Sequence, residues 1–180
     1  MVTGEAMVVA RPTLLCFSYY NSPVIARRRI SPVMTDAYPH DADCIFCRIA
    51  SGLIPCHELA ADEHVLAFLD TGPLSQGHAL VIPRAHYVTI DRMPADLAAA
   101  CGALIPRLSG AIMAATGASA WNVLQNNGKL AHQAVDHVHF HVIPRTEEQG
   151  LGITWPSGRL TDDDARSLAG RIRRQIQGAD

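Results

Sequence analysis

Apolar and polar side chains alternate along residues 137–145, which read His-Val-His-Phe-His-Val-Ile-Pro-Arg. Successive side chains of a β-strand point to opposite faces, so a strand over His137–Pro144 places its three histidines in a row on one face and its apolar residues in a core on the other. Equivalent positions repeat about every 6.6 Å, so one small anion can touch two of the imidazoles but not all three equally. The three rings are therefore expected to have different roles.

Strands are also predicted elsewhere in the chain, each where a short apolar run is bounded by turn residues. They are expected at residues 65–70, 78–83 and 120–125, with a turn at 71–77 and a loop at 126–134.

Apolar residues at spacings of three and four predict a long helix that begins near Pro94 and stops at Gly117, with a kink at Pro106. A short helix is expected to begin at Asp43, as its N-cap, and to end at Gly52. Thr161 is expected to cap a C-terminal helix with acidic residues in its first turn and an apolar face. Helices and strands in this order predict an α+β fold with one antiparallel sheet.

Composition bounds the class of protein. With 180 residues, of which 48% are hydrophobic, the chain can form one domain with an ordinary core. The formal net charge of −2 gives no basic surface for a long nucleic-acid partner, and the longest early apolar run, residues 13–20, is too short to cross a membrane. Five cysteines, an odd number at uneven spacings, argue against a disulfide framework and predict a reducing, cytoplasmic location.

Residues 1–40 differ from the rest, because they contain Arg27–Arg29, several prolines and almost no acidic side chain. Such a beginning is compatible with an organellar transit peptide, but its prolines disfavour an amphipathic helix. We expect a disordered extension instead, with Met34 as a possible natural start. The predicted organisation is an extension over residues 1–40, a domain over 43–146 and a C-terminal extension with a terminal helix over 147–180.

The row of histidines has three interpretations from spacing alone: a solvated strand face, a metal site, or chemistry at phosphorus. A resemblance separates them. Residues 137–143 match the His-φ-His-φ-His-φ-φ signature (φ apolar) of the histidine triad nucleotide-binding superfamily, and the match extends to Gly77–Pro83 and to Asn126–Gly128. The resemblance implies a five-stranded antiparallel sheet with a long packed helix and a short N-terminal helix. It also implies a homodimer formed through the helix around residues 95–116 and a strand.

The resemblance assigns roles residue by residue. It makes His139 the nucleophile that attacks an α-phosphate, and His141 a donor to a phosphate oxygen or the leaving group, together with Asn126. Asp70 would accept hydrogen bonds from the ribose, and Phe46 and Ile45 would hold the base. From the residues alone, Asn126 is also compatible with an ordinary turn residue, and Phe46 with an ordinary core residue.

The chain departs from many relatives before the triad, where it has His132-Gln133-Ala134 instead of Gly-Gln-Ser or Gly-Gln-Thr. Gln133 and Ala134 are expected to contact the nucleotide, Ala134 through its backbone amide. Its missing hydroxyl makes phosphoramidate cleavage less certain, whereas the third histidine favours hydrolysis over nucleotidyl transfer.

The implied activity is hydrolysis of a nucleoside 5′-phosphoramidate or a dinucleoside polyphosphate, with a purine nucleotide, adenosine, as the expected partner. The alternatives are a nucleotide-binding or scaffolding protein with negligible turnover and a catalytic metal site in the triad.

Cys44 and Cys47 form a C-x-x-C pair, which is compatible with two buried thiols, a redox pair or half of a zinc site. A set of bacterial relatives resembles this chain in that pair and in two histidines that complete a tetrahedral structural zinc site. The resemblance assigns them to His86 and His137. The zinc would leave His139 and His141 free and would not be required for the chemistry.

Overall fold

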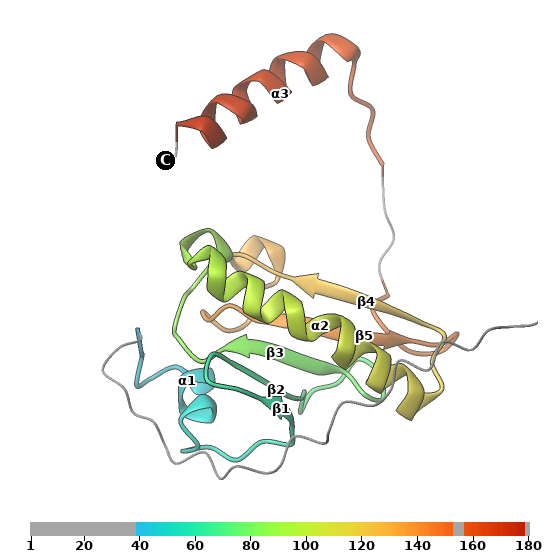
Figure 1. The fold of residues 1–180 in the computed structure, drawn as a ribbon. Helices are drawn as coiled ribbons and strands as arrows, with labels where there is room; N and C mark the ends of the chain where they lie inside the picture. The colour runs from blue at the N-terminus through green and yellow to red at the C-terminus, as the bar shows by residue number, and fades with distance from the viewer. Residues whose placement is uncertain (1–38, 153–156, 179–180) are drawn as a thin grey trace, which may run out of the picture. The chain divides into compact units, whose positions relative to one another are not determined.

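The structure is a computed structural model, which describes residues 39–152 and 157–178 (Figure 1). Its strands are β1 (Glu58–Ala61), β2 (Val65–Leu69), β3 (Ala79–Pro83), β4 (Ala120–Gln125) and β5 (Phe140–Arg145). Its α-helices are α1 (Ile45–Ala50), α2 (Ala95–Thr116) and α3 (Asp162–Gln177), with short 3-10 helices η1 (Ile90–Arg92) and η2 (Lys129–Ala131). The expected N-terminal extension lies outside the described residues except for Pro39 and His40.

The five strands form one antiparallel sheet in the order β1-β2-β3-β5-β4. This confirms the expected α+β fold and sheet. No strand was predicted at β1, because its residues Glu-Leu-Ala-Ala are half-exposed and show no alternation of large apolar and polar side chains. β1 and β4 are the two edges of the sheet, and β3 and β5 lie at its centre side by side.

Successive residues of a strand pack into two different cores, one on each face of the sheet. Ala79 and Val81 of β3 pack with Cys101, Leu108 and other residues of α2, which lies along one face of the sheet (Figure 1). Leu80 and Ile82 point to the other face and pack in a second cluster that includes residues of α1. A buried sheet with both faces apolar explains why β2 and β3 read as continuous apolar runs.

The helix ends agree in part with the predictions. Gly117 ends α2 in the left-handed region with φ 73°, and Thr161 caps α3 by accepting from the Asp164 backbone N–H at 3.2 Å. The N-cap of α1 is Cys44 and not Asp43, whose own N–H is bound by the Asp41 side chain at 2.9 Å. α2 continues through Pro106 as one helix.

The strand that carries the triad is shorter than predicted, because β5 begins only at Phe140. The backbone N–H of Val138 donates to the carbonyl of Tyr87, and that of His137 donates to Val135, so neither joins the ladder with β3. The side chains still alternate. Val138 and Val142 are fully buried in apolar clusters, and the histidines point to the opposite face. The predicted row therefore bends at its N-terminal end.

α2 is long and apolar enough, by length and composition, to cross a membrane. Its residues Leu97, Cys101, Leu108 and Ile112 are buried in clusters with the strands, as expected for the core helix of a globular domain. α3 follows residues 153–156, and its apolar side chains Leu168, Ile172 and Ile176 are exposed.

Candidate functional site

The triad histidines face the side of the sheet opposite α2. His141 pairs with Leu80 of β3, and Leu80 belongs to the cluster that packs with α1. The ring of Phe46, from α1, makes edge contacts with the rings of His137 and His139, with centroids 5.9 and 5.2 Å away. α1 therefore packs directly on the histidines and limits how their rings can turn.

His139 is buried, and its tautomer follows from one hydrogen bond. Nδ1 lies 2.7 Å from the backbone oxygen of His137, and a carbonyl oxygen can only accept, so Nδ1 carries the proton. The neutral ring then has its lone pair on Nε2. His139 thus presents an unprotonated nitrogen, the atom that a nucleophile needs.

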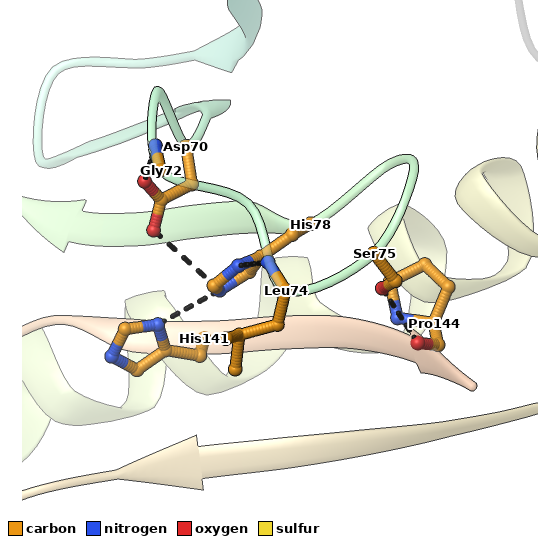
Figure 2. A network of polar contacts seen from close by, with 7 residues as sticks. All are labelled: Asp70, Gly72, Leu74, Ser75, His78, His141 and Pro144. Atoms are coloured by element: carbon orange, nitrogen blue, oxygen red, sulfur yellow. Dashed lines mark hydrogen bonds and ion pairs between the residues drawn. The ribbon is translucent and has the colours of Figure 1, made fainter. Parts of the chain in front are cut away.

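His141 is connected to a different set of groups, drawn in Figure 2. Its Nδ1 lies 2.9 Å from Nε2 of His78, and Nδ1 of His78 accepts from the backbone N–H of Leu74 at 3.2 Å. Asp70 lies next to His78, with Oδ2 3.6 Å from the same Nε2. Burial lowers the pKa of His141 to about 4, with further lowering by the neighbouring His139 and His78, so the ring is neutral near pH 7.

His78 was not among the predicted site residues. Its signals were its place in the Gly77–Pro83 segment and its position two residues before Leu80, which puts it on the triad's face of the sheet. Gly77 has φ 86°, and a Cβ there would meet the Thr116 side chain at 2.7 Å, so the turn before His78 requires glycine.

The loop between β4 and β5 is fixed by two side chains. The Asn127 side chain accepts from the N–H of Ile90 at 2.9 Å. The buried Gln133 amide donates to the carbonyls of Val88 and Val135 and accepts from the N–H of Gly128, so its side chain is fully used within the protein.

Asn126 follows β4 directly. Gln125, the last residue of the strand, pairs with Phe140, so the next position in register is opposite His139. Within the described part of the chain, the Asn126 side-chain amide donates to the backbone oxygen of His132 at a long distance of 3.5 Å. His132 has φ 63°, a left-handed conformation that costs a non-glycine residue about 1–2 kcal/mol. A glycine, which the resemblance implies at this position in many relatives, would adopt this conformation without that cost.

The other predicted nucleotide-binding residues divide into two groups. Ile45 and Ala134 are both exposed and line one open hollow, together with Val135 and Asp136. Phe46 is buried in the α1 cluster, and Asp70 lies next to His78. Phe46 thus has the packing role that the residue type alone suggests, as well as its contact with His139.

A cluster of two thiols and two imidazoles lies at the buried end of the triad, formed by Cys44, Cys47, His86 and His137. Nδ1 of His137 lies 3.5 and 3.6 Å from the sulfurs of Cys44 and Cys47, and Nδ1 of His86 lies 3.4 Å from Cys47. A tetrahedral zinc with bonds of about 2.3 Å to sulfur and 2.0–2.1 Å to nitrogen has S···N edges of about 3.6 Å. The measured separations therefore fit a tetrahedral metal ion.

His137 is prepared as a ligand by its second nitrogen. Nε2 donates to the backbone oxygen of Pro83 at 3.0 Å, which leaves the lone pair on Nδ1, the atom that faces the sulfurs. A redox cysteine has a lowered pKa, whereas burial raises that of Cys47 to about 11. In the absence of a metal ion, the Cys47 thiol is therefore protonated near pH 7 and is not a reactive thiolate.

Asp70, His78 and His141 also lie close enough together to hold a metal ion. Their geometry differs from that of the cysteine cluster, because the two ring nitrogens are 2.9 Å apart, whereas N···N edges around a tetrahedral zinc are about 3.3 Å. A separation of 2.9 Å is that of an N–H···N hydrogen bond. This second group is a hydrogen-bonded chain.

Acid should destabilise the protein through His141. Its pKa, about 4, lies below the value of about 6.5 for an unfolded histidine, so the unfolded chain binds protons more readily between these values. Stability is thus complete above about pH 6.5 and falls toward pH 4. Denaturant unfolding with excess zinc at about pH 7 and pH 5 should show this loss, and His141→Gln should reduce it. An equal loss in both proteins would contradict the assignment.

Comparison with known proteins places this site in a family. The HIT domain model matches residues 51–148. An adenosine 5′-monophosphoramidase of Schizosaccharomyces pombe is 45% identical over 135 residues, which cover 74% of this chain and 98% of the relative. An adenylylsulfatase of Arabidopsis thaliana is 41% identical over 140 residues, covering 74% of this chain and 70% of the relative.

Two solved structures are also similar. A HIT family protein from Bacillus anthracis has a TM-score of 0.72 at 38% identity, covering 74% of this chain and 97% of that one. A Zn-bound histidine triad family protein from Mycobacterium smegmatis has a TM-score of 0.57 at 32% identity, covering 77% of this chain and 98% of that one.

Proposed function

This chain belongs to the HIT domain family, and on that basis we propose that it is a hydrolase of nucleoside 5′-phosphoramidates or related adenylylated compounds. Two relatives are named as an adenosine 5′-monophosphoramidase and an adenylylsulfatase, and both names indicate an adenosine nucleotide substrate with different leaving groups. The observation that carries the proposal is the hydrogen bond of 2.7 Å that leaves the lone pair of His139 on Nε2.

In the first step, Nε2 of His139 attacks the α-phosphorus, and the bond from phosphorus to the leaving group breaks. For a phosphoramidate, the amine nitrogen takes up a proton from the solvent as it departs. The new nucleotidyl-imidazole keeps its Nδ1–H and becomes cationic, so its hydrogen bond to the His137 oxygen strengthens. The carbonyl of His137 therefore stabilises the intermediate more than the free enzyme, which lowers the barrier.

In the second step, water attacks the phosphorus of the nucleotidyl-histidine. The P–N bond breaks, the electron pair returns to Nε2, and water loses a proton to the solvent. The products are a nucleoside monophosphate and the unchanged enzyme. Because His141 is neutral near pH 7, we assign it a hydrogen bond to a phosphoryl oxygen, where negative charge develops in both steps.

Other residues hold the nucleotide. Asn126, one position beyond the β4–β5 register, is suited to donate to the phosphate opposite His139. Ile45, exposed in the hollow with Ala134, offers an apolar surface for the base. Asp70 is assigned to the ribose, and the backbone amides around Gln133 and Ala134 are assigned to the phosphate. Adenosine is the proposed nucleoside.

The preferred leaving group is determined by measuring kcat/KM for a panel of substrates that share the same nucleotide and differ in the leaving group. Amine, sulfate, aminoacyl and polyphosphate leaving groups cover the chemistry of the relatives and of the sequence prediction. Ala134 has no hydroxyl group. Ala134→Ser supplies one and should raise kcat/KM for the amine substrate in particular. If no member of the panel is hydrolysed by folded, zinc-loaded protein, the proposed hydrolase is wrong.

We also propose that Cys44, Cys47, His86 and His137 hold one structural zinc ion. The S···N separations and the lone pair on Nδ1 of His137 support it, as does the similar Zn-bound structure. When bound, the ion would supply cross-links between α1, the segment after β3 and the start of the triad.

Free cysteines at each described position support a cytoplasmic location.

A homodimer is proposed through β4 and α2. β4 is an edge strand whose Trp121 and Val123 are 46% and 47% exposed, and the outer side of α2 carries small residues such as Ala99, Gly102 and Ala103. Light scattering should give twice the 19.4 kDa chain mass.

The interface has a matched pair of variants. Val123→Lys should yield monomer, whereas Leu59→Lys, on the opposite edge strand β1 with a similarly exposed side chain, should stay dimeric. A monomer mass for the wild type at micromolar concentration would exclude the dimer.

A further inference from the structure

His78 lies beside His141, with both ring nitrogens in hydrogen bonds and its side chain 2% exposed (Figure 2). We propose that His78 is a positioning residue that holds His141 in the tautomer with its proton on Nε2, and that Asp70 supports it. The inference rests on the proposed function, because it concerns how His141 acts at phosphorus.

The assignment follows from a fixed donor at one end of the chain. The backbone N–H of Leu74 can only donate, so Nδ1 of His78 must be an acceptor, and the neutral ring carries its proton on Nε2. That proton lies between His78 and Nδ1 of His141, 2.9 Å away. Nδ1 of His141 is therefore the acceptor, and Nε2 of His141 must carry the proton.

Asp70 has two oxygens in different environments. Oδ1 accepts from the backbone N–H of Gly72 at 2.7 Å, which anchors the carboxylate in the turn after β2. Oδ2 lies 3.6 Å from Nε2 of His78, too long for a strong hydrogen bond but close enough to stabilise the partial positive charge of that N–H. The Asp70 carboxylate therefore has a second role, next to His78, besides the ribose contact assigned to it.

The consequence for the reaction is specific. Nδ1 of His141 is occupied by His78, so only Nε2–H is available to a substrate, and a neutral N–H offers a hydrogen bond without transferring a proton. His139 needs the opposite tautomer, with its lone pair on Nε2. Two adjacent imidazoles are thus held in opposite tautomers by different partners: the His137 carbonyl accepts from Nδ1–H of His139, whereas Nε2–H of His78 donates to Nδ1 of His141.

The tautomer can be measured without turnover. Nitrogen-15 NMR of the zinc-loaded full chain, with His141 assigned by its loss in His141→Gln, should show a protonated Nε2 and an unprotonated Nδ1. His78→Phe keeps the ring volume but removes both nitrogens, and it should give a mixture of the two tautomers. A proton on Nδ1 of His141 in the wild type, or an unchanged tautomer in His78→Phe, would overturn the inference.

Kinetics separate positioning from folding. His78→Phe should lower kcat by about 10- to 100-fold, the usual effect of losing a group that orients a functional histidine, while KM changes by less than about twofold. His78→Gln, whose amide can still donate to His141, should recover much of kcat. Melting temperatures of both variants show whether the fold is kept, and equal kcat losses in two folded variants would contradict a role through the hydrogen bond.

Asp70→Asn tests the support from the carboxylate. If Asp70 served only the ribose, the variant would lose nothing on a 2′,3′-dideoxy substrate. We expect kcat to fall severalfold on the dideoxy substrate as well as on the ribose substrate, and no loss on the dideoxy substrate would refute the support by Asp70. A wild type that hydrolyses nothing, yet shows a His78-dependent His141 tautomer, would contradict the proposed function while supporting the positioning of His141.

Discussion

His139→Ala should lower kcat for an adenosine phosphoramidate by about 10⁴-fold or more, because removal of a covalent nucleophile typically abolishes most of an enzyme's rate enhancement. Each factor of ten corresponds to about 1.36 kcal/mol of transition-state stabilisation, so the loss exceeds about 5 kcal/mol. The ring is buried against Phe46 and His141, so a cavity will also reduce stability somewhat. Steady-state kinetics with a measured melting temperature separates the two effects.

His57→Ala is the matched control for that experiment. His57 is an exposed histidine before β1, away from the triad, and its replacement should leave kcat within about twofold of wild type, as for most surface changes. Turnover by folded His139→Ala within threefold of wild type would show that another group is the nucleophile.

Cys44→Ser and His86→Ala should each release the zinc and lower the melting temperature by roughly 10 °C or more. The cluster joins three segments that are distant in sequence: α1, the segment after β3 and the start of the triad. Because ligand binding free energy contributes to folding, loss of the ion destabilises all three connections together. Metal analysis and thermal unfolding of protein purified without chelator provide the measurement.

Cys56→Ser is the control, since this partly buried cysteine lies outside the cluster and should keep both the zinc and the melting temperature. Activity should decrease with zinc loss, because His137 contributes its ring to the cluster and its backbone oxygen to His139. Metal-free wild type that retains its melting temperature and activity would exclude a structural zinc.

The sequence predicted the elements with strong local signals. β4 and the ends of α2 follow from apolar periodicity and from Pro94 and Gly117, which depend on local backbone preferences. The separation of the triad histidines from Val138 and Val142 follows from strand alternation alone. β1 was missed because short edge strands carry little pattern, and its pairing with β2 is a tertiary effect.

The start of β5 was misplaced for a related reason. Alternation continues through His137, but the backbone of Val138 bonds to Tyr87, which is distant in sequence and could not be identified from the pattern. The same holds for His78. Its chemistry depends on Leu74, Asp70 and His141 meeting at one point, whereas the sequence shows only a histidine after glycine.

The candidate site was likewise predictable from the sequence only in part. The resemblance named His139, His141 and the four members of the cysteine cluster, and the structure brings each set together. It gave no information on tautomers, which depend on individual carbonyl and amide contacts. The side chain of Gln133 also could not be interpreted from sequence, since its three bonds to the backbone appear only in the folded loop.

The most direct test of the central claim is to trap the covalent intermediate. Wild-type protein mixed with an adenosine phosphoramidate, quenched within the first turnover under acid-free conditions and digested, should yield a peptide containing His139 that carries one adenylyl group. The adduct should be absent from His139→Ala and should decay at the rate at which adenosine monophosphate forms. Full turnover with no adduct at any time, and inversion of configuration at phosphorus with a chiral substrate, would contradict nucleotidyl-His139 catalysis.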